Sequence, residues 1–265
     1  MNSELVKSSW ALAKARQLAS YLSLRHPCDM EIDDIAFSRN IIVKDGKLNG
    51  AEGRLVRISN TGVITVSDSI KEQTRRRFII SHEIGHFELH QNHDQLALCT
   101  NRDLIYNYQQ VQPEEREATI FGIELLLPEE LLKDKYQNKK PSFQLAKTIS
   151  KEFQTSLTFS LMRILDFTSY PVALVVCEKG QIKWFKTTEN FGYGLTPKDP
   201  LDSRTVAYEY FKRNVLSEES DKVPADAWIK NRRVNPEDTI EEECLPIPSY
   251  SHVLALLHYE KTHDA

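Results

Sequence analysis

The pentapeptide His-Glu-Ile-Gly-His at residues 82–86 constrains the fold of this chain more than any other segment. On a helix, residues four apart lie on one face and about 6 Å apart along the axis, so His82 and His86 can reach one metal ion. Glu83 is rotated by roughly a quarter turn and can act on a water molecule at the metal instead of binding the ion. The motif therefore predicts a zinc-hydrolase site, provided that another segment supplies a third ligand.

The residues around the pentapeptide predict a buried helix from about 71 to 91. Its apolar side chains are Phe78, Ile79, Ile84, Phe87 and Leu89, and we expect it to be buried on more than one side. Burying two histidines and a glutamate without a shared partner would be costly. The arginines at residues 75–77 are interpreted as a solvated helix start, with a docking surface for an acidic substrate segment as the alternative.

Within the same helix, His90 is the local candidate for the third ligand. His90 lies eight residues after His82, which is about 12 Å along a straight helix, so both cannot bind one ion unless the helix breaks. We therefore expect His90 and His93 to face solvent or to pack against a loop. The polar stretch that follows is expected to be a long loop, in which Tyr106 or Tyr108 are candidate donors to the transition state.

A second helix is predicted from Pro113 to Leu127, ended by Pro128. Its acidic residues could supply a carboxylate ligand; Glu115 is favoured and Glu117 is the alternative. Glu115, Thr119 and Gly122 line one stripe at helical spacing, and we expect this stripe to face the first helix.

The small residues Gly85 and Gly122 would let the backbones of the two helices approach each other closely. Thr119, one turn after Glu115, is placed to hydrogen-bond His82 or His86.

Composition excludes several classes of protein. A net charge of -4 and a pI near 6.1 argue against a protein that coats nucleic acid. The four cysteines are scattered without paired spacing, which indicates a reducing compartment. The chain shows no secretory signal and no apolar run of membrane-spanning length. We expect a cytoplasmic protein.

The pattern of elements predicts an α+β fold. A helix at about 5–25 precedes strands at 41–44, 54–59 and 62–67, the last two joined by a tight hairpin at Asn60-Thr61. Two short helices are expected between 142 and 166. From about 168 onward, strands in PVALVVC, QIKWFKT and SHVLALLHY and a helix in LDSRTVAYEYFKRN predict a second α+β domain. The predicted organisation is therefore 1–130, 131–167 and 168–265.

The helix pair at 142–166 could be a helix-turn-helix. Its second helix carries apolar residues typical of a core, and only Ser156, Thr158, Ser160 and Arg163 could face bases. Packing within the protein is therefore favoured over contact with DNA.

The segments HEIGHFELH (82–90) and EREATIFGIELLLP (115–128) together resemble the ImmA/IrrE family of gluzincin-type metallopeptidases. The resemblance spans roughly residues 10–165. It implies a helical, zincin-like peptidase domain with a small antiparallel sheet, followed by helix-turn-helix-like helices. It places the metal ligands on His82, His86 and Glu115 and the catalytic glutamate on Glu83. The implied metal is Zn²⁺, with Mn²⁺ tolerated.

Two positions depart from the pattern of that family. Thr119 stands where Asn or Asp is usual, and Gly122 replaces a common Ala. The first departure concerns the partner that orients a histidine and leaves the ligand set unchanged.

The resemblance implies an endopeptidase that cleaves one protein substrate at a specific site. That substrate would be a helix-turn-helix transcriptional repressor in a stress-response or mobile-element switch. The C-terminal domain would be sensory, of a GAF- or PAS-like kind. Two alternatives remain: a metal- or redox-sensing regulator that binds DNA through residues 142–166, and a partner-binding module of a toxin–antitoxin-like pair.

Overall fold

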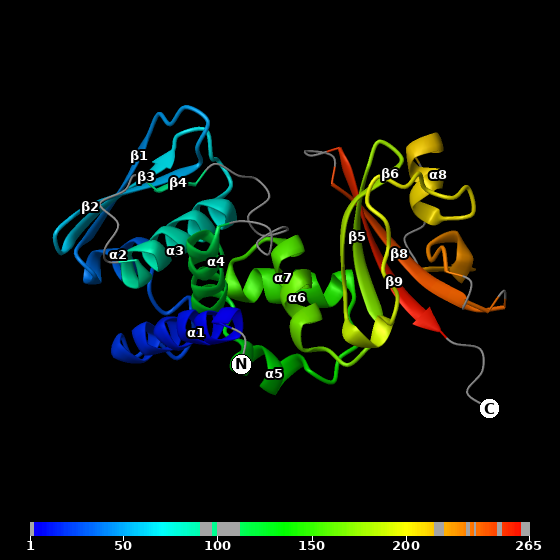
Figure 1. Cartoon of the computed structure of the whole chain (residues 1–265), viewed down its shortest axis with the longest axis horizontal. Coiled ribbons are helices and arrows are strands. Elements are labelled where there is room, and N and C mark those ends of the chain that lie inside the picture. The colour runs from blue at the N-terminus through cyan, green and yellow to red at the C-terminus, as the bar shows by residue number, and fades with distance from the viewer. Residues whose placement is uncertain are drawn as a thin grey trace. The chain divides into compact units, whose positions relative to one another are not determined.

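The structure is a computed structural model of the chain, in which residues 3–90, 97–99, 112–214, 220–231, 234–235, 237–247 and 251–260 are described. These residues form a mixed α+β fold, as predicted (Figure 1). Within them, no helix is both long and apolar enough to cross a membrane.

The chain divides into two compact units. Unit 1 comprises Met1–Leu132 and Ile149–Phe159, and unit 2 comprises Lys133–Thr148 and Ser160–Ala265. The predicted helix pair is formed by α6 (Phe143–Phe153) and α7 (Leu157–Phe167). Each of these helices contributes residues to both units, whereas the sequence suggested a separate segment at 131–167.

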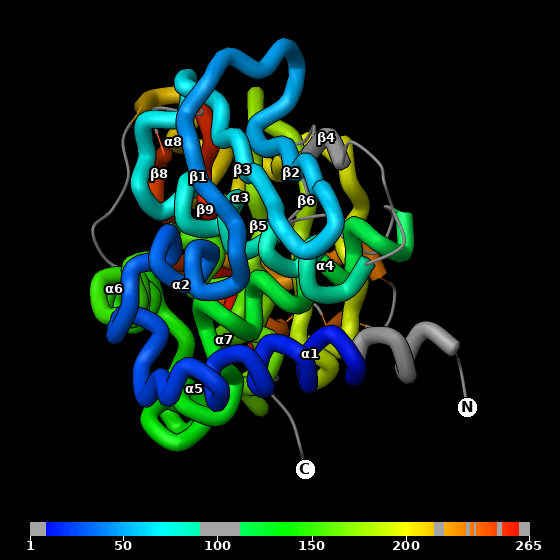
Figure 2. The backbone as a smooth tube through the Cα atoms, turned by 90° about the vertical axis from the view of Figure 1, so that its left-hand side faces the viewer, coloured from blue at the N-terminus to red at the C-terminus, as the bar shows by residue number. Residues whose placement is uncertain are grey.

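Unit 1 contains a four-stranded sheet with the order β1-β3-β2-β4. Figure 2 shows β1, β3 and β2 side by side in this order. Its strands are β1 (Ile41–Gly46), β2 (Gly53–Ile58), β3 (Thr61–Ser67) and β4 (Ala97–Cys99). β2 and β3 form the predicted antiparallel hairpin. β1 pairs with β3 in parallel, so the sheet is mixed and not purely antiparallel as predicted. The reason is that the chain reverses between β1 and β2 and again between β2 and β3.

Strand β4 lies in the stretch that was predicted to be a loop. It pairs antiparallel with β2, from Gly53↔Cys99 to Leu55↔Ala97. Three residues are too few to show strand periodicity, and the pairing depends on a partner more than 40 residues earlier in the chain. Tyr106, Tyr108 and His93 lie outside the described residues.

The pentapeptide lies in helix α3 (Gln73–Leu89), where every residue from Arg77 to Phe87 is buried. The predicted burial on more than one side is thus confirmed. Within unit 1, α3 packs against β2 and β3 of the sheet and also against α1 (Ser3–Tyr21), α2 (Ile32–Ser38) and α4 (Pro113–Leu126). Figure 1 shows α4 crossing α3 on the side away from the sheet. A salt bridge of 2.7 Å between Arg16 Nε and the buried Glu124 holds α1 against α4.

The arginines at residues 75–77 are partly or fully buried and paired with acidic residues, which corrects the expectation of a solvated helix start. Arg75 pairs with Glu52, and Arg76 makes two contacts with Asp33, of 2.7 and 2.9 Å. Arg77 is only 5% exposed. The acidic partners lie 23 and 43 residues away in the sequence, where a local charge pattern does not reveal them. Since these charges are matched inside unit 1, the alternative of a docking surface loses its support.

Unit 2 is built on a five-stranded antiparallel sheet with the order β6-β5-β9-β8-β7. Its strands are β5 (Val172–Glu178), β6 (Gln181–Thr187), β7 (Asp221–Pro224), β8 (Thr239–Ile247) and β9 (His252–Glu260). Its other elements are η2 (Glu189–Phe191), α8 (Val206–Arg213) and η3 (Ala225–Ala227). Helix α5 (Glu129–Tyr136) contributes residues to both units. β5, β6, β9 and α8 agree with the sequence prediction, whereas α5, β7 and β8 were not predicted. A GAF- or PAS-like role for this unit stays a prediction.

A buried carboxylate organises the packing of α8 on this sheet. Glu242 of β8 is 0% exposed and accepts four hydrogen bonds. Two come from the backbone N–H groups of Val206 and Ala207 at the start of α8, at 3.0 and 2.8 Å. The others come from the indole N–H of Trp228, at 3.0 Å, and from the thiol of Cys244, at 3.2 Å. Glu242 therefore satisfies donors at a helix start that would otherwise be buried without partners.

Replacing Glu242 with alanine is expected to lower the free energy of unfolding by roughly 2–4 kcal/mol, because buried donors lose their acceptor. Urea unfolding followed by circular dichroism would measure this change. The matched control is Glu237→Ala, an exposed glutamate near the same strand, which should stay within about 0.5 kcal/mol of the original protein. Equal unfolding midpoints for the two variants would contradict this role of Glu242.

Candidate metal centre

The two helices of the site approach each other through small residues, as the sequence predicted. A Cβ atom added at Gly85 of α3 would lie 2.9 Å from the carbonyl oxygen of Ala118 and 3.0 Å from its Cα. A Cβ atom at Gly122 of α4 would lie 2.9 Å from Ser81 Oγ and 3.1 Å from the backbone nitrogen of His82. Such distances are shorter than ordinary van der Waals contact, so each glycine lets one backbone lie against the other helix.

Replacing Gly85 with alanine is expected to destabilise the protein by roughly 1–2 kcal/mol. Alanine normally stabilises a helix interior by about 1 kcal/mol relative to glycine, but overpacking against a backbone costs about 1–3 kcal/mol. Gly194→Ala is the control, because a Cβ atom there meets nothing within 4 Å. A Gly85→Ala variant as stable as the original protein in urea unfolding would show that the helices can move apart freely.

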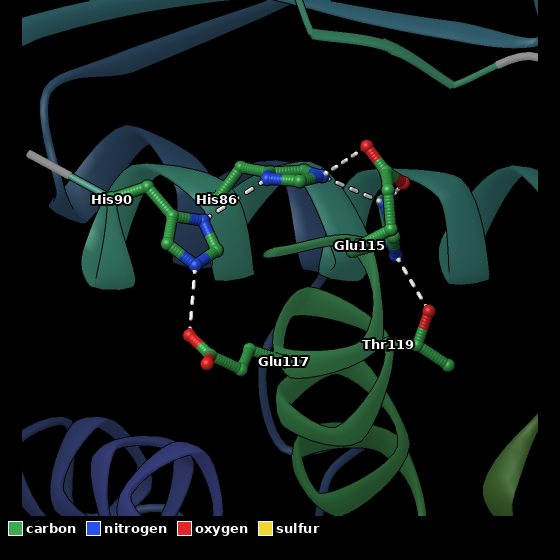
Figure 3. Close-up of polar contacts among 6 residues, drawn as sticks. His86, His90, Glu115, Glu117 and Thr119 are labelled. Atoms are coloured by element: carbon green, nitrogen blue, oxygen red, sulfur yellow. Dashed lines mark hydrogen bonds and ion pairs between the residues drawn. The ribbon is translucent and has the colours of Figure 1, made fainter. Parts of the chain in front are cut away.

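His82, His86 and Glu115 lie together where α3 and α4 cross, and Figure 3 shows the carboxylate of Glu115 beside the imidazole of His86. The Nε2 atoms of the two histidines are 3.0 Å apart. Glu115 Oε2 is 3.1 Å from His82 Nε2, and Glu115 Oε1 is 3.3 Å from His86 Nε2. Two imidazole nitrogens and one carboxylate thus converge on one point.

The other ring nitrogen of each histidine has a polar partner. Thr119 Oγ1 is 3.2 Å from His82 Nδ1, one of the two contacts that the stripe on α4 predicted for Thr119. His86 Nδ1 is 3.1 Å from His90 Nδ1. Both Nε2 atoms are therefore directed at the shared point, and both Nδ1 atoms face away from it.

His90 does not face solvent, which corrects the expectation from the sequence. Its side chain is 9% exposed, and its Nε2 atom is 3.1 Å from Glu117 Oε2 (Figure 3). Glu117, the alternative third ligand, therefore lies beside His90 and outside the cluster formed with Glu115. The sequence signal for this contact is the spacing of four residues from His82 to His86 and from His86 to His90, which puts all three rings on one face of α3.

Glu83 is the most isolated charged group among the described residues of the site. It is 0% exposed, and neither of its carboxylate oxygens has a hydrogen-bond partner in the described part of the chain. Gly53 of β2 lies against it: a Cβ atom at Gly53 would be 2.7 Å from Glu83 Oε1. Burial raises the pKa of Glu83 well above its ordinary value, and the negative charge of Glu115 raises it further. A carboxyl with such a pKa is suited to accept and return a proton.

The electrostatics of the cluster keep Glu115 ionised and His86 neutral. Burial alone would raise the pKa of Glu115, but hydrogen bonds and charge interactions with His82 and His86 outweigh it and hold that pKa far below its usual range. Burial lowers the pKa of His86. An ionised carboxylate and a neutral imidazole are the forms of these groups that bind metals.

The donor set of this cluster fits a metal ion. The ligand atoms of His82, His86 and Glu115 all lie within 4.8 Å of one another. The orphaned, fully buried carboxylate of Glu83 beside them requires a polar partner, because an isolated buried charge is unstable. A cation at the shared point, with water beside it, would satisfy both requirements.

Comparison with known proteins agrees with this arrangement. Residues 38–165 match the model of the IrrE N-terminal-like domain, Peptidase_M78, which includes both helices of the site and supports a metallopeptidase-like activity. A solved structure named "Mycobacterium tuberculosis transcriptional regulator" shares the fold with a TM-score of 0.54 at 14% sequence identity. That similarity covers 98% of this chain and 82% of the other. No curated protein matches the chain significantly. The match of residues 38–165 to the IrrE N-terminal-like domain supports membership of the ImmA/IrrE family, which the two helix motifs of the chain resemble.

Proposed function

We propose that this protein is a zinc-dependent endopeptidase with His82, His86 and Glu115 as metal ligands and Glu83 as the catalytic residue. The observation that carries the proposal is the fully buried, partnerless carboxylate of Glu83 beside the convergent His-His-Glu cluster. Three protein ligands of this kind, with one coordination position left open, are typical of catalytic rather than structural zinc sites. Mn²⁺ is the alternative ion.

When bound, zinc would supply Lewis-acid chemistry by lowering the pKa of water and polarising the carbonyl of the scissile peptide. Glu83 takes one proton from water through a carboxylate oxygen, and the resulting hydroxide oxygen forms a bond to the carbonyl carbon. The carbon–nitrogen bond then breaks. Glu83 returns the proton to the leaving amine, so the products are a carboxylic acid and a free amine. The raised pKa of Glu83 favours the return of that proton.

The proposed substrate is a helix-turn-helix transcriptional repressor that is cleaved at a specific site. Support comes from the match of residues 38–165 to the IrrE N-terminal-like domain. The restricted setting of Glu83, which is fully buried and lies against Gly53, also suits a selective enzyme better than a digestive one.

The decisive experiment incubates the purified chain with a repressor encoded near its gene and identifies the fragments by mass spectrometry. Cleavage at one site with Zn²⁺, absent with a chelator and restored by added Zn²⁺, is the expected result. A parallel incubation with Mn²⁺ identifies the preferred ion. An intact repressor in the presence of saturating Zn²⁺ would contradict the proposed substrate, and intact unstructured peptides as well would contradict the peptidase.

A second candidate function is a transcriptional regulator that binds DNA through α6 and α7 and uses the metal centre as a sensor. The name of the structural neighbour favours it. Against it, two of the four residues in or directly before α7 that could face bases are buried: Ser160 is 0% exposed and Arg163 is 6% exposed. DNA affinity that falls steeply with salt and is lost on neutralising the exposed Lys147 and Lys151 of α6 would support this candidate.

A further inference from the structure

A polar chain leads from Glu117 through His90 to His86, away from the point where the ligand atoms converge (Figure 3). Glu117 Oε2 lies 3.1 Å from His90 Nε2, and His90 Nδ1 lies 3.1 Å from His86 Nδ1. The side chains of His90 and Glu117 are each 9% exposed, and that of His86 is 7% exposed. A buried chain of this kind has a defined order of donors and acceptors.

The order of protons along this chain follows from what each group can donate. An ionised carboxylate only accepts, so the contact with Glu117 places the proton of a neutral His90 on Nε2. His90 Nδ1 is then an acceptor, and the proton of this second contact must sit on His86 Nδ1. A neutral imidazole carries one N–H, so His86 Nε2 is left with a free lone pair. That atom lies 3.0 Å from His82 Nε2 and 3.3 Å from Glu115 Oε1.

We propose that His90 and Glu117 are positioning residues that hold His86 in the tautomer able to bind the metal through Nε2. The assignment rests on the proposed function, because it matters only if His86 is a ligand. Metal-binding histidines commonly donate their second N–H directly to a carboxylate. In this chain His90 lies between the metal-binding candidate His86 and the carboxylate of Glu117.

The geometry of α4 explains why Glu117 reaches His86 through His90 and not directly. Glu117 is two residues after Glu115, which is roughly 200° around the helix, so the two carboxylates point in different directions. His90 lies one helical turn beyond His86 and reaches back to its Nδ1 atom. His82 has a different arrangement: its Nδ1 partner is Thr119, whose hydroxyl can donate or accept and therefore does not impose one tautomer.

Zinc affinity, measured by competition with a chromophoric chelator, tests the assignment. His90→Phe keeps a planar aromatic ring of somewhat larger size but removes the acceptor, and we expect it to weaken Zn²⁺ binding by about 10- to 100-fold. His90→Asn restores an acceptor oxygen close to the position of Nδ1 and should recover most of the affinity. Glu117→Gln, whose amide can donate as well as accept, should give a smaller loss. His26→Phe is the control, because His26 is another partly buried histidine of unit 1 that packs on Phe153 instead of the site.

A second readout separates tautomer control from packing. With Co²⁺ in place of Zn²⁺, the ligand-field absorption should change in His90→Phe, return towards the original spectrum in His90→Asn, and stay unchanged in His26→Phe. Equal losses of affinity in His90→Phe and His90→Asn, or no loss in either, would overturn the assignment while leaving the peptidase intact. Failure of the unmodified chain to bind Zn²⁺ would instead overturn the proposed function and, with it, this inference.

Discussion

Replacing Glu83 with glutamine should reduce peptide cleavage by about 10²- to 10⁴-fold, the usual contribution of a positioned general base. Glutamine keeps the size and shape of the side chain but does not take up a proton from water. His82, His86 and Glu115 are unchanged by this substitution, so the variant should retain Zn²⁺ with close to the original affinity. The expected result is thus a protein that binds Zn²⁺ but no longer cleaves peptides.

The same substitution should make the metal-free protein more stable at neutral pH. Burial and the charge of Glu115 raise the pKa of Glu83 in the folded protein. A carboxyl whose pKa is higher in the folded than in the unfolded state destabilises the fold as pH rises above its unfolded-state value of about 4.3. Glutamine carries no such penalty. The stability difference between the variant and the original protein should therefore be present at pH 7 and disappear below about pH 4.

Cleavage rates, zinc content and thermal unfolding of the metal-free proteins at several pH values measure these opposite effects. Glu88→Gln is the matched control, because Glu88 lies on the same helix and pairs with Arg39 instead of facing the site. Cleavage at the original rate by Glu83→Gln would exclude Glu83 as the general base. Unchanged biological activity of an inactive Glu83→Gln variant would favour a metal-sensing regulator or a partner-binding module of a toxin–antitoxin-like pair.

The arrangement of α3 and α4 was predictable because the information lies in local spacing. The four-residue interval between the histidines and the stripe of Glu115, Thr119 and Gly122 are properties of single helices. The place where the two helices make contact was predictable from Gly85 and Gly122. Glycine is unfavourable inside a helix, so its presence at both positions indicates that another backbone packs closely there.

The features that escaped prediction depend on partners far away in the sequence. The arginines at residues 75–77 resembled a solvated run because the acidic residues that pair with them belong to other elements. The parallel pairing of β1 with β3 follows from where the β2–β3 hairpin is placed, which no single strand encodes.

Strand β8 and the contact between His90 and Glu117 were also missed, because the residue types involved usually have another role. Strand β8 was missed because its buried position 242 is a glutamate, which breaks the alternation of apolar and polar residues typical of a strand. The glutamate is there because the backbone N–H groups at the start of α8 need a hydrogen-bond acceptor. From the sequence, His90 was expected to face solvent or to pack against a loop, and Glu117 was the alternative to Glu115 as third ligand. Their contact with each other could be recognised only once α3 and α4 were placed together.

Replacing Glu115 with alanine should cause the largest loss of metal among single substitutions on α4. It removes both a proposed ligand and the only carboxylate within the cluster of described residues, leaving two imidazoles to hold a divalent cation. We expect the loss of Zn²⁺ affinity to exceed the roughly 10- to 100-fold cost of removing an outer partner. Cleavage should disappear at zinc concentrations that saturate the original protein.

Substitutions of the neighbouring acids make the assignment of Glu115 specific. Glu114→Ala removes an equal charge from the same helix turn and should leave zinc stoichiometry unchanged, because Glu114 lies outside the cluster of ligand atoms found among the described residues and affects His86 through its charge alone. Glu117→Ala should give an intermediate loss, because it acts on His86 only through His90. The loss of zinc binding should therefore be largest for Glu115→Ala, smaller for Glu117→Ala and absent for Glu114→Ala. This order distinguishes a ligand from a positioning residue and from a residue without a role in metal binding. If Glu117→Ala released the metal and Glu115→Ala retained it, the third ligand would be Glu117 and α4 would have to rotate on α3.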